Sequence, residues 1–118
     1  MFVETLGMKM KARQAIDALG ALAQEHRLQL FRLLVQAGAE GMAAGELARA
    51  IDIPNSSLSF HLGHLQRSGL IAQRRAGRSL IYSADYRAMD QLIAYLMENC
   101  CGGAGCAPAS ATLEKETT

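Results

Sequence analysis

The chain has 118 residues, of which 50% are apolar and 19% are charged, and these values predict one globular domain with its own core. It has three Phe, three Tyr and no Trp, so the core has to be mainly aliphatic, which favours helices. No apolar run approaches the roughly 20 residues of a membrane span, and the first residues lack a leader pattern, so we expect no membrane partner and a cytoplasmic location. The formal net charge of +1 excludes a strongly basic or acidic chain, although not a local charged surface.

The first half of the chain is predicted to contain four helices. Residues 8–24 carry apolar side chains at helical spacing, and because these have no obvious partner in the chain, a subunit interface is one candidate for covering them. Residues 25–37 present a broad apolar face and end at Gly38, which indicates the central core helix. After a glycine-rich turn, a short helix at 46–50 and a longer one at 55–67 form a helix-turn-helix candidate.

The second half is predicted to contain a hairpin and a last helix. Residues 70–73 and 80–83 read as two short strands joined by the basic turn "RRAGR". Asp85 is a suitable N-cap for a clean amphipathic helix that runs into the cysteines near residue 99. Residues 107–118 are small, polar and unpatterned, so we expect a disordered tail.

A basic surface is predicted from the distribution of charge. Between residues 53 and 84 the sequence contains no Asp or Glu. The same window holds six Arg and His side chains, which are His61, His64, Arg67, Arg74, Arg75 and Arg78. Such a surface suits a nucleic-acid partner, and the alternative is a chance gap in the acidic residues.

One side of the helix at 55–67 is predicted to face DNA. Leu58, Leu62 and Leu65 fall together on one side of a helical wheel, and mostly short polar or cationic groups occupy the rest. The candidate DNA-binding residues of this helix are Asn55, Ser56, Ser57, Ser59, Phe60, His61, His64 and Arg67. Hydroxyls, imidazoles and a guanidinium can bond base edges or phosphates, and an aromatic ring can contact a thymine methyl. Two alternatives remain open, namely that Phe60 is a core aromatic and that His61 is a structural histidine.

The hairpin tip is the second candidate contact with DNA. Arg74, Arg75 and Arg78 surround one glycine directly after the helix-turn-helix candidate. Charge at a hairpin tip often serves only solubility. Here it continues the acid-free window, so we favour a wing that lies along the phosphate backbone or enters a minor groove.

The run "LARAIDIPNSSLSFHLGHLQRSGLIAQRRAGRSLIYSA", preceded by "ALAQEHRLQLFRLL", resembles the winged-helix repressors of the ArsR/SmtB family. The resemblance covers roughly residues 15–99. It implies a mainly α fold with a β-hairpin wing, that is, a winged helix-turn-helix of order ααααββα. It also implies a homodimer in which the first and last helices form the interface and the two helix-turn-helix units read a palindromic operator. We accordingly assign residues 8–99 to DNA binding and dimerisation.

All three cysteines lie near the end of the chain, at Cys100, Cys101 and Cys106. Three thiolates are soft ligands that select thiophilic ions, and trivalent arsenic is satisfied by three sulfurs, whereas structural zinc usually takes four ligands. Adjacent side chains diverge by about 100° on a helix, so the glycines after Cys101 are expected to let the chain bend and bring Cys106 back. Residues 100–106 are therefore predicted to be an inducer-binding loop.

This chain lacks the inducer-binding residues that two other branches of the family carry, so the resemblance assigns sensing to the cysteines. The short helix "GMAAGELARA" carries no Cys-x-Cys pair, and the last helix has no His of the kind that zinc sensors of the family use. A further similarity, to the arsenite-responsive branch with a "CC…C" cluster, supports As(III) as inducer, with Sb(III) as a close relative.

We therefore expect an arsenic-responsive repressor that binds operator DNA as a dimer and is released when As(III) binds the cysteines. The alternatives are sensing of Cd, Pb or Zn, a thiol-redox switch in which Cys106 pairs with one of the adjacent cysteines, and exposed thiols without a ligand. An enzyme is not expected, nor a catalytic cofactor, since the chain has no Cys-x-x-C pair, no phosphate-cradling loop and no His near the thiols.

Overall fold

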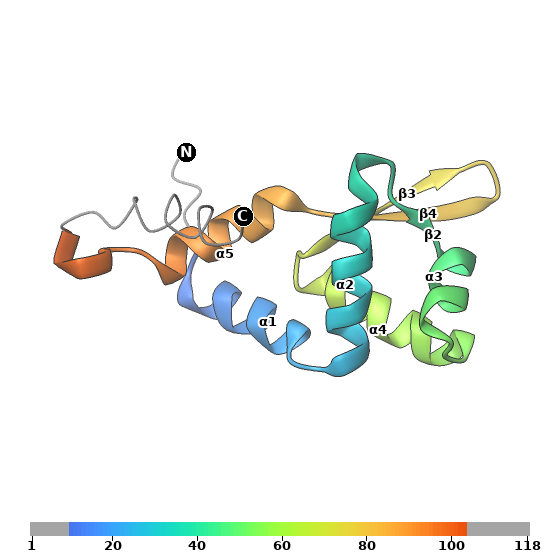
Figure 1. Cartoon of the computed structure of the whole chain (residues 1–118), viewed down its shortest axis with the longest axis horizontal. Coiled ribbons are helices and arrows are strands. Elements are labelled where there is room, and N and C mark those ends of the chain that lie inside the picture. Colours follow the sequence, from blue (N-terminus) through green and yellow to red (C-terminus); the bar gives the residue numbers. More distant parts are fainter. Residues whose placement is uncertain (1–9, 104–118) are drawn as a thin grey trace, which may run out of the picture.

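The structure is a computed structural model that describes residues 10–103. It is mainly helical with one small antiparallel sheet, which confirms the predicted winged helix-turn-helix (Figure 1). In chain order the elements are α1 (Ala12–Leu22), α2 (Glu25–Ala37), η1 (Gly38–Glu40), β2 (Met42–Ala43), α3 (Ala44–Ile51), α4 (Asn55–Arg67), β3 (Ile71–Ala76), β4 (Ser79–Ala84), α5 (Tyr86–Leu96) and η2 (Cys100–Gly103). Among the described helices, none is long and apolar enough to cross a membrane.

The core is aliphatic, as the composition predicts. Its largest fully buried side chains are Leu30, Leu34, Leu47, Leu65 and Leu70. They come from α2, α3, α4 and the start of the hairpin, so α2 lies at the centre of the fold (Figure 1). Burial of each such side chain stabilises the fold by roughly 1.5–3 kcal/mol relative to an exposed position.

The helices α1 and α5 lie next to each other at the end of the molecule opposite the hairpin tip (Figure 1). The face that α1 turns to the core consists of small residues, Ala15, Ala18 and Ala21. Its larger side chains point outward, with Ile16 64% and Leu19 42% exposed. On α5 and at its C-cap, the exposed apolar residues are Ile93, Leu96 and Met97. Both helices therefore carry apolar surface that the rest of the described chain leaves uncovered.

The sheet has three strands in the order β2-β4-β3, one more than the predicted hairpin. The additional strand β2 lies where a simple turn was expected, and its Met42 pairs with Tyr82 of β4. Gly41 permits this pairing, because its φ of 71° is unfavourable for other residues and a Cβ there would collide with the carbonyl of Tyr82.

The hairpin is longer than predicted. Arg74 and Arg75 belong to β3 and pair with Ile81 and Leu80, so they are not part of the turn. The chain reverses at Gly77 and Arg78, where Gly77 has a φ of 65°. A two-residue turn with glycine at its first position suits the twist of a hairpin.

The helix-turn-helix and the start of α5 have the expected local structure. The predicted bounds of α4 are those of the structure, and α3 begins two residues earlier than predicted. Asp52 ends α3 in the left-handed conformation, with a φ of 63°. Asp85 caps α5, since its carboxylate accepts a hydrogen bond of 3.0 Å from the backbone N–H of Ala88.

Candidate nucleic-acid interface and thiol pair

The outer side of α4 is polar apart from one aromatic ring. Leu58, Leu62 and Leu65 are buried, as the helical wheel predicts. Phe60 is 60% exposed, so it points away from the core and the alternative of a core aromatic is wrong. An exposed ring of this size on a helix surface is available for contact with a partner.

The remaining candidate DNA-binding residues of α4 differ in exposure. Asn55, Ser56, Ser59 and Arg67 are exposed, whereas Ser57 and His64 are half-buried. The first turn of α4 contains no acidic residue. Because the first backbone N–H groups of a helix have no partner within it, this end of α4 is electrostatically suited to an anion such as a phosphate.

His61 occupies a different environment from its neighbours. It is only 9% exposed, and its Nδ1 atom lies 3.3 Å from Nη1 of Arg27 on α2. Burial lowers the pKa of His61 most, and the charges of Arg27, His26 and His64 lower it further. The neutral imidazole is thus favoured, with Nδ1 free to accept a hydrogen bond from the guanidinium. This placement favours the structural alternative for His61.

His64 and Arg67 lie one turn apart on α4. Burial, together with the charges of Arg27 and Arg67, lowers the pKa of His64. A Cβ at Gly63 would lie 3.2 Å from Nη1 of Arg67, so the missing side chain leaves room for that guanidinium. Gly63 therefore allows Arg67 to pack against the surface of α4.

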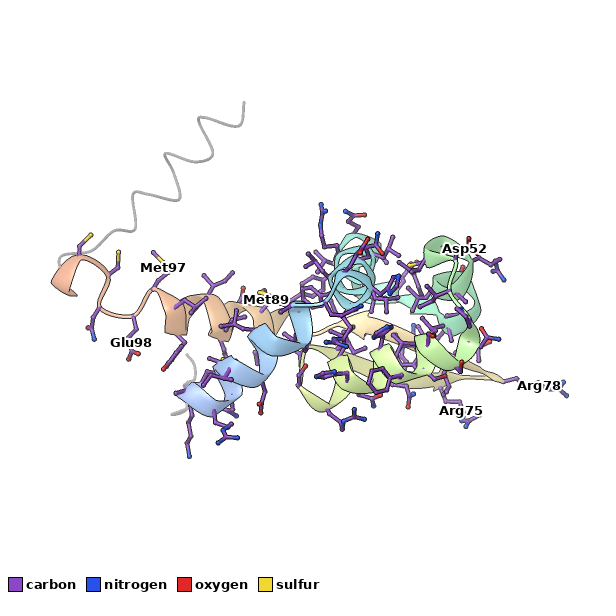
Figure 2. All side chains as sticks on the ribbon, turned by 90° about the horizontal axis from the view of Figure 1, so that it is seen from below. Asp52, Arg75, Arg78, Met89, Met97 and Glu98 are labelled. Carbon is purple, nitrogen blue, oxygen red and sulfur yellow. The ribbon has the colours of Figure 1, made fainter. Side chains whose placement is uncertain are left out.

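The three arginines of the hairpin differ in their surroundings. Arg74 donates a hydrogen bond of 3.0 Å from Nη2 to the carbonyl oxygen of Glu40, which ties the hairpin to η1. Arg75 and Arg78 are exposed, and Arg78 projects from the hairpin tip (Figure 2). All three arginines thus have the exposure that a phosphate contact requires, and Arg74 is in addition tied to η1.

The cysteines follow α5 after a short irregular stretch. Asn99 and Cys101 have φ values of 58° and 57°, so the backbone has already left the helical conformation before the glycines. This turn brings Sγ of Cys100 to 3.6 Å from Sγ of Cys101. Two adjacent cysteines therefore point their sulfurs together, which an undistorted helix would not allow.

The two thiol positions differ in chemical state. Cys100 is a half-buried free thiol, whereas Cys101 is exposed and disulfide-bonded. The third predicted ligand, Cys106, and the predicted tail at 107–118 lie outside the described residues. Within residues 10–103 no three Cys, His, Asp or Glu side chains are grouped so that they could hold a metal ion.

Sequence reasoning missed Arg27 and Glu40, which hold the candidate surface in place. Both act over 34 positions of sequence, Arg27 on His61 and the Glu40 carbonyl on Arg74. No local pattern marks such pairs. The acid-free window was the only indirect sign of these contacts in the sequence. It left His61 and Arg74 without an acidic partner nearby in the sequence, so their partners had to come from elsewhere in the chain.

The fold and this surface define a winged-helix DNA-binding protein, and comparison with known proteins agrees. Residues 22–74 match a family described as a helix-turn-helix domain. The chain is 32% identical over 89 residues to the transcriptional activator HlyU of Vibrio cholerae, which covers 73% of this chain and 80% of that protein. It is also 32% identical over 79 residues to a putative arsenical resistance operon repressor of Halobacterium salinarum, covering 67% of this chain and 60% of that protein.

Among solved structures, the chain resembles an ArsR family transcriptional regulator, RHA00566. The TM-score is 0.65 at 25% identity, over 78% of this chain and 92% of that one. The chain belongs to the ArsR family of transcriptional regulators. It is thus a DNA-binding regulator and not an enzyme, as the sequence predicts.

Proposed function

We propose that the chain is a homodimeric repressor that binds operator DNA through α4 and the β3–β4 hairpin. The outer side of α4 supports this proposal best, because it presents exposed polar side chains and Phe60 on a helix whose opposite side is buried leucine. In this proposal α4 lies in a major groove, while Arg75 and Arg78 contact the backbone alongside it. Arg74 holds the hairpin at the required angle through the Glu40 carbonyl.

The exposed apolar faces of α1 and α5 support a dimer. The exposed fractions lie between 42% and 64% for Ile16 and Leu19 on α1, for Ile93 and Leu96 on α5, and for Met97 at the C-cap of α5. A contiguous exposed apolar surface of this kind is typical of a protein interaction site. A second copy of the chain is the partner we propose, since a dimer places two α4 helices to read two half-sites.

The inducer in this proposal is As(III), bound by Cys100, Cys101 and Cys106. The supporting observation is the separation of 3.6 Å between Sγ of Cys100 and Sγ of Cys101. Two sulfurs that share a metal ion through bonds of about 2.3 Å lie roughly 3.8 Å apart in a tetrahedron, and closer in a pyramid. Once the disulfide of Cys101 is reduced, this separation suits one ion shared by the two sulfurs, and Cys106 is the third ligand that we assign.

Ligand binding is proposed to release DNA through the dimer interface. The thiol pair follows directly after α5, and the exposed face of α5 belongs to the proposed interface. A shift of α5 would change the spacing of the two α4 helices, so that they no longer fit both half-sites. Thermodynamic linkage requires operator DNA to weaken arsenite binding by the same factor, typically through a coupling of about 1–3 kcal/mol.

The test is a mobility-shift titration with a duplex enriched by the wild-type chain from a random-sequence pool. Arsenite, antimonite, cadmium and zinc are added to the reduced wild type and to Cys100→Ser, Cys101→Ser and Cys106→Ser. We expect arsenite to release the wild type and to lose this effect in each variant. Release by arsenite in all three variants would show that the cysteines are not the inducer site. Equal arsenite affinity with and without the duplex would contradict the linkage.

A thiol-redox switch is the second candidate, because Cys101 is disulfide-bonded while Cys100 is a free thiol. In this alternative an oxidant such as peroxide takes two electrons from two thiols, which form a disulfide as the peroxide is reduced to water. We assign Cys106 as the partner of Cys101. Release of the duplex by peroxide without metal, reversed by a dithiol reductant, would favour this alternative, whereas release by arsenite only under reducing conditions would favour the arsenic sensor.

A further inference from the structure

The side chain of Arg27 joins three helices at the back of α4. Its own backbone N–H donates to the side-chain oxygen of Gln24, the N-cap of α2, at 3.0 Å. Its Nε donates to the carbonyl oxygen of Ala21 near the end of α1, at 2.7 Å. Its Nη1 lies 3.3 Å from Nδ1 of His61 on α4. One guanidinium thus bridges the end of α1 and the middle of α4.

The position of His61 makes this bridge relevant to DNA binding. His61 is buried at the inner side of α4, although its side chain is polar. It directly follows Phe60, and the centroids of the two rings lie 5.5 Å apart in an edge arrangement. Any rotation of α4 that moved His61 would therefore also redirect Phe60 and the polar side chains around it.

We propose that Arg27 is a positioning residue for DNA recognition, because it fixes the rotation of α4 relative to the end of α1 through the Ala21 carbonyl and His61. The proposal rests on the proposed function, in which the outer side of α4 reads DNA. The Arg27 bridge also connects DNA recognition by α4 to the proposed dimer interface, because α1 carries Ile16 and Leu19 in that interface.

The chemistry of the bridge requires arginine and a neutral histidine. A guanidinium has several N–H donors in a rigid plane, so it can donate to two acceptors at once, whereas a lysine ammonium on a flexible stem cannot reproduce that geometry. The titratable or charged groups that face His61 are Arg27 and His26 from α2 and His64 from α4 itself. All three disfavour a charged imidazole, which keeps Nδ1 available as an acceptor.

A direct contact between Arg27 and a DNA phosphate is the competing explanation, and salt dependence separates the two. The logarithm of a DNA-binding constant falls with the logarithm of salt concentration by about 0.9 for each phosphate that the protein neutralises. Loss of a phosphate contact therefore reduces that slope by about one. Loss of a positioning contact leaves the slope unchanged and lowers only the preference for the specific sequence.

The experiment compares full-length Arg27→Gln and Arg27→Lys with the wild type on the enriched duplex and on a scrambled duplex. Arg32→Gln is the matched control, because Arg32 is an exposed arginine on the same helix. We expect both Arg27 variants to bind the enriched duplex about tenfold more weakly, the usual effect of losing a hydrogen bond to a charged group. Binding to the scrambled duplex and the salt slope should stay at wild-type values, and Arg32→Gln should differ from the wild type by less than about twofold on the enriched duplex.

A double-mutant cycle covers the case in which Arg27→Gln folds poorly. His61→Leu, and His61→Leu with Arg27→Gln, are measured with all affinities corrected for the active fraction. We expect the second substitution to have little further effect once the first has removed the bridge. Additive losses, a salt slope reduced by about one, or unchanged affinity of the Arg27 variants would each overturn the proposal.

Arg67→Gln separates failure of this inference from failure of the proposed function. Arg67 is exposed on α4 and is a proposed DNA contact. If Arg67→Gln weakens binding while the Arg27 variants do not, only the bridge is wrong. If neither substitution affects binding, the proposed surface on α4 is wrong and the inference falls with it.

Discussion

Two glycines with nearly the same backbone conformation allow the contribution of β2 to be measured. Gly38 has φ 80° and ψ −163°, and Gly41 has φ 71° and ψ −164°. Replacement by alanine costs about 1–3 kcal/mol at either position, because other residues rarely adopt this region. Their surroundings differ: no heavy atom lies within 4 Å of a Cβ at Gly38, whereas a Cβ at Gly41 would overlap the Tyr82 carbonyl and lie 3.1 Å from Cγ2 of Ile81.

The overlap at Gly41 can be relieved only if β2 moves away from β4. That movement weakens the two pairs Met42–Tyr82 and Ala43–Ile81, and each backbone hydrogen bond contributes about 0.5–1.5 kcal/mol. We therefore expect Gly41→Ala to be about 1–3 kcal/mol more destabilising than Gly38→Ala. With a urea m-value of about 1–3 kcal/mol/M, this difference corresponds to a midpoint lower by roughly 1 M.

The assay is urea unfolding of both variants and the wild type, followed by circular dichroism. Protein concentration is held fixed, because the stability of a dimer depends on it. Equal free energies of unfolding for the two variants, within about 0.5 kcal/mol, would refute the reasoning, since the strain alone would then account for both. A change in m-value in one variant would show that the folded or unfolded state itself had changed.

Three further substitutions test single contacts. His61→Asn removes a titrating group whose pKa in the folded chain is lowered, mainly by burial. The wild type should therefore lose stability as the pH falls from 6.5 through that lower pKa. The variant should lose less stability over the same range, as measured by urea unfolding at a series of pH values. Asp85→Ala removes the acceptor for the Ala88 N–H and should cost about 1 kcal/mol; an unchanged free energy of unfolding would show that the cap contributes nothing. Tyr86→Phe deletes a hydroxyl that donates to the Val35 carbonyl at 2.8 Å and should lower the free energy of unfolding by about 0.5–1.5 kcal/mol, with an unchanged value contradicting the contact.

The parts of the fold that depend on local patterns could be predicted from the sequence. The bounds of α4 follow from leucines at helical spacing, and the start of α5 follows from Asp85 as a cap. The order of elements completes the winged helix. The exposure of Phe60 also follows from the wheel, because the ring lies opposite the buried leucines.

The parts that were missed depend on partners far away in the sequence. The strand β2 has only two residues and exists because Met42 pairs with Tyr82. The hairpin was predicted too short because every residue of β3 after Ile71 is exposed, so no alternation marks it as a strand. On α1 the buried face is formed by alanines. A sequence pattern assigns the large apolar residues to the core, whereas on this helix they are exposed, as Ile16 is.

The two ends of α5 are held very differently, which bears on how the thiol pair could act. The first turn is fixed, because Asp85 caps it and the hydroxyl of Tyr86 bonds to α2. Towards the other end, Ile93, Leu96 and Met97 are about half exposed before the chain reaches Cys100. A change at the cysteines therefore acts on the C-terminal end of α5, where contacts within the chain cover the helix least. The proposed dimer contact would transmit this change to the second copy. For that reason an obligate monomer should bind arsenite normally and yet show no linkage between arsenite and DNA, which a charged substitution at Leu96 can test by sedimentation and titration.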